Sequence, residues 1–136
     1  MFNTSAKINY ALHALLEITE RHGSGLVQIN DIIKNHAMPK NYLEQILNKL
    51  TKSGLIRGIR GSNGGYALGR DPQTISLYQI MEAIDGELGL EQISDIDAVR
   101  ETLHELERSI RTTLSISLEQ LLKRRHAKNG TLDYQI

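Results

Sequence analysis

Apolar positions recur at helical spacing over most of the chain. The spacing predicts helices at about 4–22, 31–36, 39–52, 77–85 and 95–115, and a last helix that starts after Ser117. Two extended segments, 55–60 and 66–68, flank the turn sequence GSNGG, which is typical of a β-hairpin. The expected fold class is therefore mostly α with a small β-hairpin.

The second and third predicted helices are separated by a tight turn, which is the pattern of a helix-turn-helix. We expect Asn30 to cap the second helix and Pro39 to occupy the first position of the third. The third helix has a polar front and an apolar back, which consists of Leu43, Ile46, Leu47 and Leu50. A hairpin follows this helix-turn-helix, so the predicted architecture is a winged helix.

The long helix at 95–115 carries a narrow apolar seam with alternating spacings of three and four residues. The seam consists of Ile96, Val99, Leu103, Leu106 and Ile110. A single long helix with such a stripe more often meets a copy of itself than its own domain. We therefore predict a homodimer, with packing of the seam against the winged-helix body as the alternative.

Charge is distributed unevenly, although the formal net charge is zero. Residues 1–72 carry nine Lys or Arg and five Asp or Glu, whereas residues 73–122 carry three and ten. Residues 123–136 are basic again, with four and one. A basic half beside an acidic half suggests one face for a polyanion and another for a different partner. Runs of like charge on ordinary solvated surfaces are the alternative.

The chain contains no cysteine, which excludes disulfides, thiolate metal sites and cysteine nucleophiles. Its five histidines are scattered, and no Ser/His/Asp order stands out. We therefore predict no metal, no cofactor and no enzymatic activity. No apolar run approaches the ~20 residues that span a membrane, and the N-terminal sequence lacks the apolar stretch of a signal peptide. The expected location is the cytoplasm.

The glycine-rich stretch RGIRGSNGGYALGRDP at 57–72 is open to several interpretations. A Walker loop needs a lysine after its second glycine and then a helix, but strand residues follow here. The dinucleotide fingerprint is also absent, because Gly58, Gly61 and Gly64 are evenly spaced. A purely structural hairpin and a DNA-contacting wing remain. We favour the wing, because arginines beside a thin glycine tip can enter a narrow minor groove.

The polar front of the third helix carries side chains that suit DNA. Asn41 and Gln45 can pair with base edges, and Glu44 can accept a hydrogen bond from cytosine N4. An ion pair of Glu44 with Lys40 or Lys49 is the alternative. The predicted DNA-binding residues are Lys7, Lys40, Asn41, Tyr42, Glu44, Gln45, Lys49, Arg57, Arg60, Ser62, Asn63, Gly64, Gly65 and Tyr66.

These patterns divide the chain into three parts. We expect a winged helix-turn-helix DNA-binding domain at 1–86, and an acidic loop with the dimerisation helices at 87–122. A flexible basic tail is expected at 123–136.

Five segments together resemble one family of winged-helix transcription regulators. They are KINYALHALLEI (7–18), YLEQIL (42–47), SGLI (53–56), RGSNGGYALGRDP (60–72) and ISLYQIMEAIDG (75–86). The family includes the iron–sulfur regulator IscR, the nitric-oxide sensor NsrR and the cysteine-metabolism repressor CymR. The resemblance implies a homodimer with a helix in the major groove and a wing in the minor groove of a palindromic operator. It points to Tyr42, Glu44 and Gln45 as readers of the sequence and to Arg60 as the wing contact.

The chain departs from the cluster-binding relatives, which carry three cysteines in the loop before the dimer helix. The corresponding loop GELGLEQISDI (86–96) has none, so the chain is most similar to the cysteine-free branch that includes CymR. This resemblance implies a repressor of cysteine or sulfur metabolism that lacks an iron–sulfur cluster. It also suggests cysteine synthase as a partner. The C-terminal sequence LDYQI ends in isoleucine, like the serine acetyltransferase tails that enter that enzyme.

Two other functions remain open from the sequence alone. One is a regulator of another pathway that senses a small molecule in a pocket near residues 84–96. The other is a protein-interaction module that has lost DNA binding.

Overall fold

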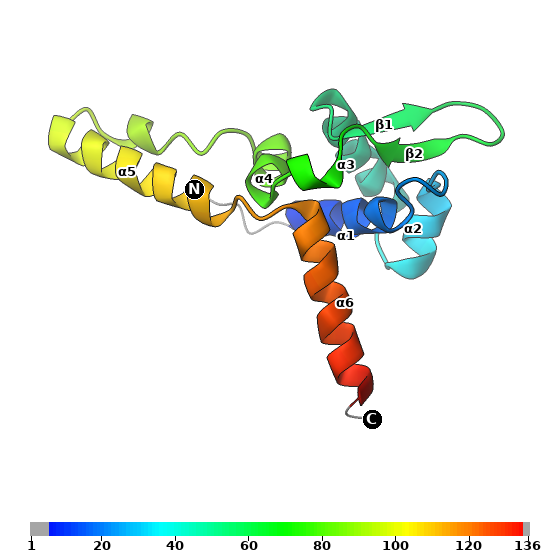
Figure 1. The fold of residues 1–136 in the computed structure, drawn as a ribbon. Helices are drawn as coiled ribbons and strands as arrows, with labels where there is room; N and C mark the ends of the chain where they lie inside the picture. Colours follow the sequence, from blue (N-terminus) through cyan, green and yellow to red (C-terminus); the bar gives the residue numbers. More distant parts are fainter. Residues whose placement is uncertain (1–5, 135–136) are drawn as a thin grey trace.

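The computed structural model describes residues 6–134 and shows a winged-helix body from which two helices extend (Figure 1). In chain order the elements are α1 (Ala6–Glu20), α2 (Ile29–Asn35), α3 (Lys40–Lys52), β1 (Ile56–Ile59), β2 (Gly65–Leu68), η1 (Pro72–Thr74), α4 (Leu77–Asp85), η2 (Leu90–Ile93), α5 (Asp97–Thr113) and α6 (Leu118–Tyr134). A mostly helical fold with a two-stranded antiparallel hairpin confirms the predicted fold class.

The core of the body forms where α1 packs against α3, α4 and the hairpin. The buried face of α1 recurs at helical spacing and includes Ala11, Ala14, Leu15 and Ile18. The buried positions of α3 are those of its predicted apolar back: Leu43, Ile46, Leu47 and Leu50. Burial of one such leucine or isoleucine contributes about 1.5–3 kcal/mol. This packing fixes the rotation of α3 about its axis and turns its polar front outward.

The wing consists of β1 and β2, paired from Ile56↔Leu68 to Ile59↔Gly65. The segment before α2 adds one antiparallel bridge to this hairpin. The N–H of Val27 donates to the carbonyl of Tyr66 at 3.0 Å, and the N–H of Tyr66 donates to the carbonyl of Val27 at 2.8 Å. The base of the wing is therefore fastened to the chain that enters the helix-turn-helix.

A junction of hydrogen bonds joins the start of α4 to the start of α6. Ser76 with Gln79 forms a capping box at the start of α4, and Ser117 with Gln120 forms the same arrangement at α6. The two serines pair across an antiparallel bridge. Backbone hydrogen bonds of 2.8 and 2.9 Å between the two segments flank this bridge. We call this arrangement the capping junction.

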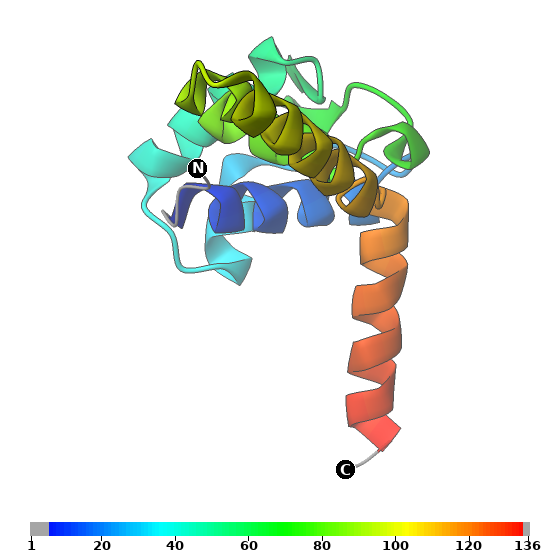
Figure 2. The ribbon, with the colours of Figure 1, turned by 90° about the vertical axis from the view of Figure 1, so that its left-hand side faces the viewer.

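α5 extends away from the winged-helix body, and α6 leaves the body in a different direction (Figures 1 and 2). None of the residues of α5 is buried. A helix of this length gains most of its stability from tertiary packing of its apolar face, and within the described chain η2 covers only part of α5.

The structure corrects the expected loose tail, because α6 continues from Leu118 to Tyr134. Its first turns are held against α1, where Glu20 accepts hydrogen bonds from Arg125, at 3.3 Å, and from His126. Residues 123–130 of the helix are mostly polar or charged and form no apolar stripe. None of the helices within residues 6–134 is long and apolar enough to cross a membrane.

Two helix starts also differ from expectation. α2 begins at Ile29, and its N-cap is Gln28 rather than Asn30, because the carboxylate of Asp31 accepts a hydrogen bond from the N–H of Gln28 at 3.0 Å. α3 begins at Lys40, with Pro39 as its N-cap in extended conformation.

Candidate nucleic-acid interface

An open groove of about 420 Å³ lies between the helix-turn-helix and the wing. From α3 it is lined by Lys40 and Glu44, and from the wing by Arg60 and Tyr66. The apolar back of α3 is buried, so its front is held toward this space. The groove therefore brings predicted residues of the helix and of the wing together, although more than fifteen positions separate them in the sequence.

The charge of the groove suits a polyanion, because Lys40 and Arg60 flank the single acid Glu44. Glu44 has no ion pair with Lys40 or Lys49 within 4.0 Å among the described residues, so the alternative interpretation of an ion-paired Glu44 finds no support. Arg57 is exposed on β1, and Asn41 and Gln45 are exposed on α3. Their polar atoms are available to a ligand that lies along this face.

The tip of the wing is a tight turn that depends on glycine. The N–H of Gly64 donates to the carbonyl of Gly61 at 3.0 Å, and Gly61 has a φ of +119°. A Cβ atom on Gly64 would overlap the carbonyl oxygen of Ile59 and would lie 2.9 Å from that of Gly61. Ser62 and Asn63 are exposed at this tip. The glycines thus make a thin turn that places the backbone and Arg60 beside the groove.

Gly65 has a different reason to be glycine. A Cβ atom there would lie 2.9 Å from the carbonyl oxygen of Val27, because the bridge between Val27 and Tyr66 brings the two chains close together. Glycine at position 65 therefore allows the wing to lie close enough to the body to form this bridge.

Three predicted DNA-binding residues take other positions. The ring of Tyr42 packs edge-on against that of Tyr10, with ring centroids 5.5 Å apart, and helps to join α3 to α1. The Nζ atom of Lys49 donates to the carbonyl oxygen of Ile84 at the end of α4, at 3.1 Å. Lys7 is half-buried in the first turns of α1. Their role in DNA binding stays a prediction.

Sequence reasoning missed the third side of the groove, which the start of α2 forms through Gln28, Ile29 and Asn30. The amide of Gln28 donates to the carbonyl of Gly64 at 3.3 Å, across 36 positions of sequence. The only signal in the sequence was Asn30 as an expected helix cap, which placed a polar side chain at this helix start without indicating what it faces.

The predicted seam of α5 forms an exposed apolar stripe. The exposed fractions are 60% for Ile96, 38% for Val99 and 45% for Leu106. Leu103 and Ile110 are partly exposed. Ile93, in η2, is also exposed, with an exposed fraction of 67%. Packing of the seam against the winged-helix body is not observed in the described chain, which leaves the face free for a partner.

The family model of Rrf2, described as an iron-dependent transcriptional regulator, matches residues 4–124. The chain belongs to the Rrf2 family. This family consists of winged-helix DNA-binding transcription regulators, and the curated relatives are regulators rather than enzymes.

Two regulators illustrate the relationship. The HTH-type transcriptional regulator CymR of Bacillus subtilis is 32% identical over 100 residues, which cover 73% of this chain and 72% of CymR. The regulator IscR of Escherichia coli is 35% identical over 81 residues, which cover 60% of this chain but only 50% of IscR. The solved structure of CymR, described as the global cysteine regulator of B. subtilis, matches with a TM-score of 0.76 at 29% identity. That match covers 91% of this chain and 98% of CymR.

The residues of this Rrf2 protein do not fit the iron in the family description. Iron–sulfur clusters are held mainly by cysteine thiolates, and the chain has no cysteine. Within residues 6–134, no group of three or more histidine, aspartate or glutamate side chains is arranged to hold a metal ion. In the loop 86–96, Glu91 instead contacts His104 of α5. We assign no iron site to this chain.

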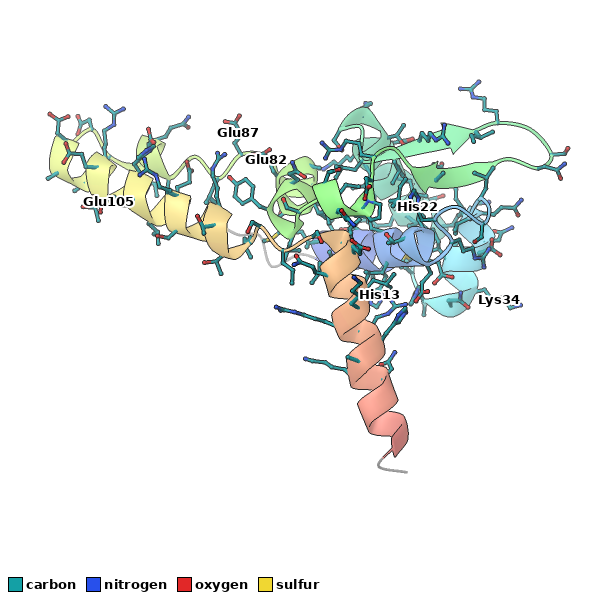
Figure 3. The ribbon with its side chains drawn as sticks, in the orientation of Figure 1. His13, His22, Lys34, Glu82, Glu87 and Glu105 are labelled. Carbon is teal, nitrogen blue, oxygen red and sulfur yellow. The ribbon has the colours of Figure 1, made fainter. Side chains whose placement is uncertain are left out.

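A second open cavity, of about 510 Å³, lies between the loop 86–96 and α5. Its charged lining residues are Glu87, Glu91, Asp95, Arg100, Glu107 and Arg111. Figure 3 shows Glu87 near α4, whereas Glu105 lies on the part of α5 remote from the body. Pockets for small ligands are usually concave and mostly apolar, so this charged, open surface gives the alternative of a small-molecule sensor no specific support.

Arg111, which lines this cavity, also contacts Tyr78 of α4. The guanidinium of Arg111 lies over its ring, 4.9 Å from the centroid. Burial raises the pKa of the Tyr78 phenol above its usual value. Tyr78 and Arg111 therefore act as a contact between the body and the last turn of α5.

Proposed function

We propose that this Rrf2 protein is a homodimeric, sequence-specific repressor that binds a palindromic DNA operator and has no enzymatic activity. The observation that carries the proposal is the groove, in which the polar front of α3 and the glycine-tipped wing face one space. A recognition helix in the major groove with its wing in the adjacent minor groove would bury both sets of side chains on one duplex. Such a protein acts where the chromosome is, so we propose the cytoplasm as its location.

Within this proposal each part of the interface has its own role. Asn41, Glu44 and Gln45 read base edges in the major groove, and Glu44 accepts from a cytosine amino group. Lys40 and Arg57 neutralise phosphates, which positions the protein without reading the sequence. Arg60 enters the minor groove, whose negative potential is strongest where A/T-rich sequence narrows it.

The exposed seam supports the dimer. Two copies of α5 that pair along Ile96, Val99, Leu103, Leu106 and Ile110 would remove this apolar surface from water. The pairing would also place two recognition helices for half-sites one or more helical turns apart. We therefore propose the winged-helix body, residues up to 86, as the DNA-binding part and α5 as the dimerisation helix.

The experiment starts from operators selected by the purified protein from a random-sequence DNA duplex library. We expect palindromic sites that bind with a steep inverse dependence on salt, since lysine and arginine displace counterions from phosphates. Arg60→Ala should weaken binding by ~1.5–3 kcal/mol, because it removes charged hydrogen bonds, and most strongly at sites with A/T-rich flanks. Fluorescence anisotropy measures the affinities.

Lys123→Ala is the matched control for Arg60→Ala. It removes one positive charge from an exposed side chain on α6, far from the groove, and its binding should equal that of the native protein. Failure of the library to converge on any sequence, or affinities that do not change with salt, would show that the protein is not a DNA-binding regulator.

For the pathway we propose control of cysteine or sulfur metabolism, supported by the similarity to the cysteine regulator CymR. The proposed partner is cysteine synthase, bound through the C-terminal tail, of which residues 135–136 lie outside the described part of the chain. Deleting residues 133–136 should abolish binding to cysteine synthase in calorimetry and leave operator binding intact. Unchanged binding of the truncated chain to the enzyme would exclude tail docking.

A further inference from the structure

We propose that Gln28 is a positioning residue, which holds the tip of the wing at a fixed place over the recognition helix through its hydrogen bond to Gly64. The effect of this hydrogen bond on DNA affinity rests on the proposed function. Its effect on the mobility of the wing does not, because the mobility can be measured in the free protein.

The base and the tip of the wing are fastened by different means. At the base, two backbone hydrogen bonds join Val27 to Tyr66. Beyond Gly65, the described contacts between the tip and the body include the amide Nε2 of Gln28, which donates to the carbonyl oxygen of Gly64 at 3.3 Å. A two-stranded ribbon is marginally stable by itself, so a tip held only through its base would move freely. The hydrogen bond of Gln28 supplies a second point of attachment.

Gln28 can serve this purpose only if its own backbone is fixed. It is the N-cap of α2, and its N–H donates to the Oδ2 atom of Asp31 at 3.0 Å. The guanidinium of Arg21, the residue that follows α1, donates to the same carboxylate oxygen at 3.5 Å. The start of α2 is therefore tied to α1 as well as to the wing.

The other end of α2 is held by Glu17 of α1. Its Oε1 atom accepts from the side-chain amide of Asn35 at 2.9 Å, and its Oε2 atom lies 3.7 Å from the Nε2 atom of His36. The ring of His36 also stacks on that of His13, with centroids 4.4 Å apart. His13, on α1, lies beside the base of α6 (Figure 3), and burial, His36 and Arg125 lower its pKa.

These contacts add to the packing of α2, whose Ile29, Ile32 and Ile33 lie in or against the core. The helix has seven residues, of which only Ile32 is fully buried. A helix so short depends on its surroundings for stability. Because both ends of α2 are fixed to α1, α2 is held rigidly in the body. The hydrogen bond of Gln28 then fixes the tip of the wing relative to the body.

The first test uses the free protein. Gln28→Met keeps the length of the side chain but removes the donor, and the wing should become more mobile. NMR relaxation of the amides at residues 61–65 should show order parameters that fall from about 0.85 toward 0.6, while the amides of β1 stay unchanged. Lys34→Met, on the exposed side of α2 (Figure 3), is the matched control and should leave the wing as it is. Unchanged order at residues 61–65 would refute the proposal, whether or not the protein binds DNA.

The second test distinguishes positioning from direct contact, since Gln28 also lines the groove. Operator affinity should fall about three- to tenfold in Gln28→Met. In an Arg60→Ala background the same substitution should have little further effect, because a wing without its arginine gains little from being held in place. Additive losses would mean that Gln28 contacts the DNA itself, and would overturn the positioning role. Denaturation curves of the native protein, the two single variants and the double variant show whether their free energies of unfolding differ.

Discussion

Replacing Val99 and Leu106 by glutamate should convert the protein into a monomer and weaken binding to a palindromic operator by about 10²- to 10⁴-fold. Both side chains lie on the exposed stripe of α5, in a helix that buries none of its residues in the described chain. In a dimer each glutamate would place an unpaired charge in an apolar interface, which costs several kcal/mol. A monomer occupies half-sites one at a time and loses the effective concentration that a second, linked domain provides.

Light scattering coupled to size-exclusion chromatography measures the mass, and anisotropy measures operator affinity. The matched control is the double variant Ala98→Glu with Thr112→Glu, which adds the same charges at exposed positions of α5 outside the seam. It should remain dimeric and bind normally. A native chain that is already monomeric, or a Val99→Glu, Leu106→Glu variant that still runs as a dimer, would mean that the stripe has another occupant.

The second large effect is expected from Gly64→Ala. The added Cβ atom would overlap the carbonyl oxygen of Ile59, so the turn of the wing must change its conformation. Backbone shifts of this kind cost ~1–3 kcal/mol, and the new turn would displace Arg60 from the groove. We expect operator affinity to fall at least about tenfold, equivalent to ~1.4 kcal/mol, with a smaller loss at non-specific DNA. Urea denaturation and anisotropy measure the two quantities.

Gly58→Ala provides the comparison for Gly64→Ala. Gly58 lies in β1, and a Cβ atom there would meet only the ring of Tyr66 at an ordinary contact distance of 3.5 Å. This variant should fold and bind like the native protein. Equal affinities of the two alanine variants would contradict the role that we give to the wing.

Local sequence patterns predicted those helices whose ends and buried faces are determined by residues close together in the sequence. The helix at 77–85 was predicted with the bounds that the structure shows, and local residues explain this, since Ser76 with Gln79 caps its start and Gly86 follows its end. The apolar back of α3 was also predicted in full, since helical periodicity encodes it directly. The continuation of α6 was missed because a polar helix without an apolar stripe leaves no periodic signal.

The groove could be predicted only in part. The polar front of α3 and the arginines of the wing follow from periodicity and turn residues, but their common space depends on packing between distant segments. The hydrogen bonds from Gln28 to Gly64 and from Lys49 to Ile84 join residues 36 and 35 positions apart. No spacing rule anticipates such pairs, which is why one side of the groove and the contact of Lys49 with α4 were overlooked.

The capping junction has a mechanical consequence for the dimer. Because serine boxes, an antiparallel bridge and flanking backbone hydrogen bonds connect the exit of α5 to the start of α4, the body and the last turn of α5 turn as one unit. Arg111 over Tyr78 adds a side-chain contact at the same joint. A change in the crossing angle of two paired α5 helices would then move the two recognition helices farther apart or closer together. A signal could thus alter the span between half-sites, and so release the operator, without touching any residue of the groove.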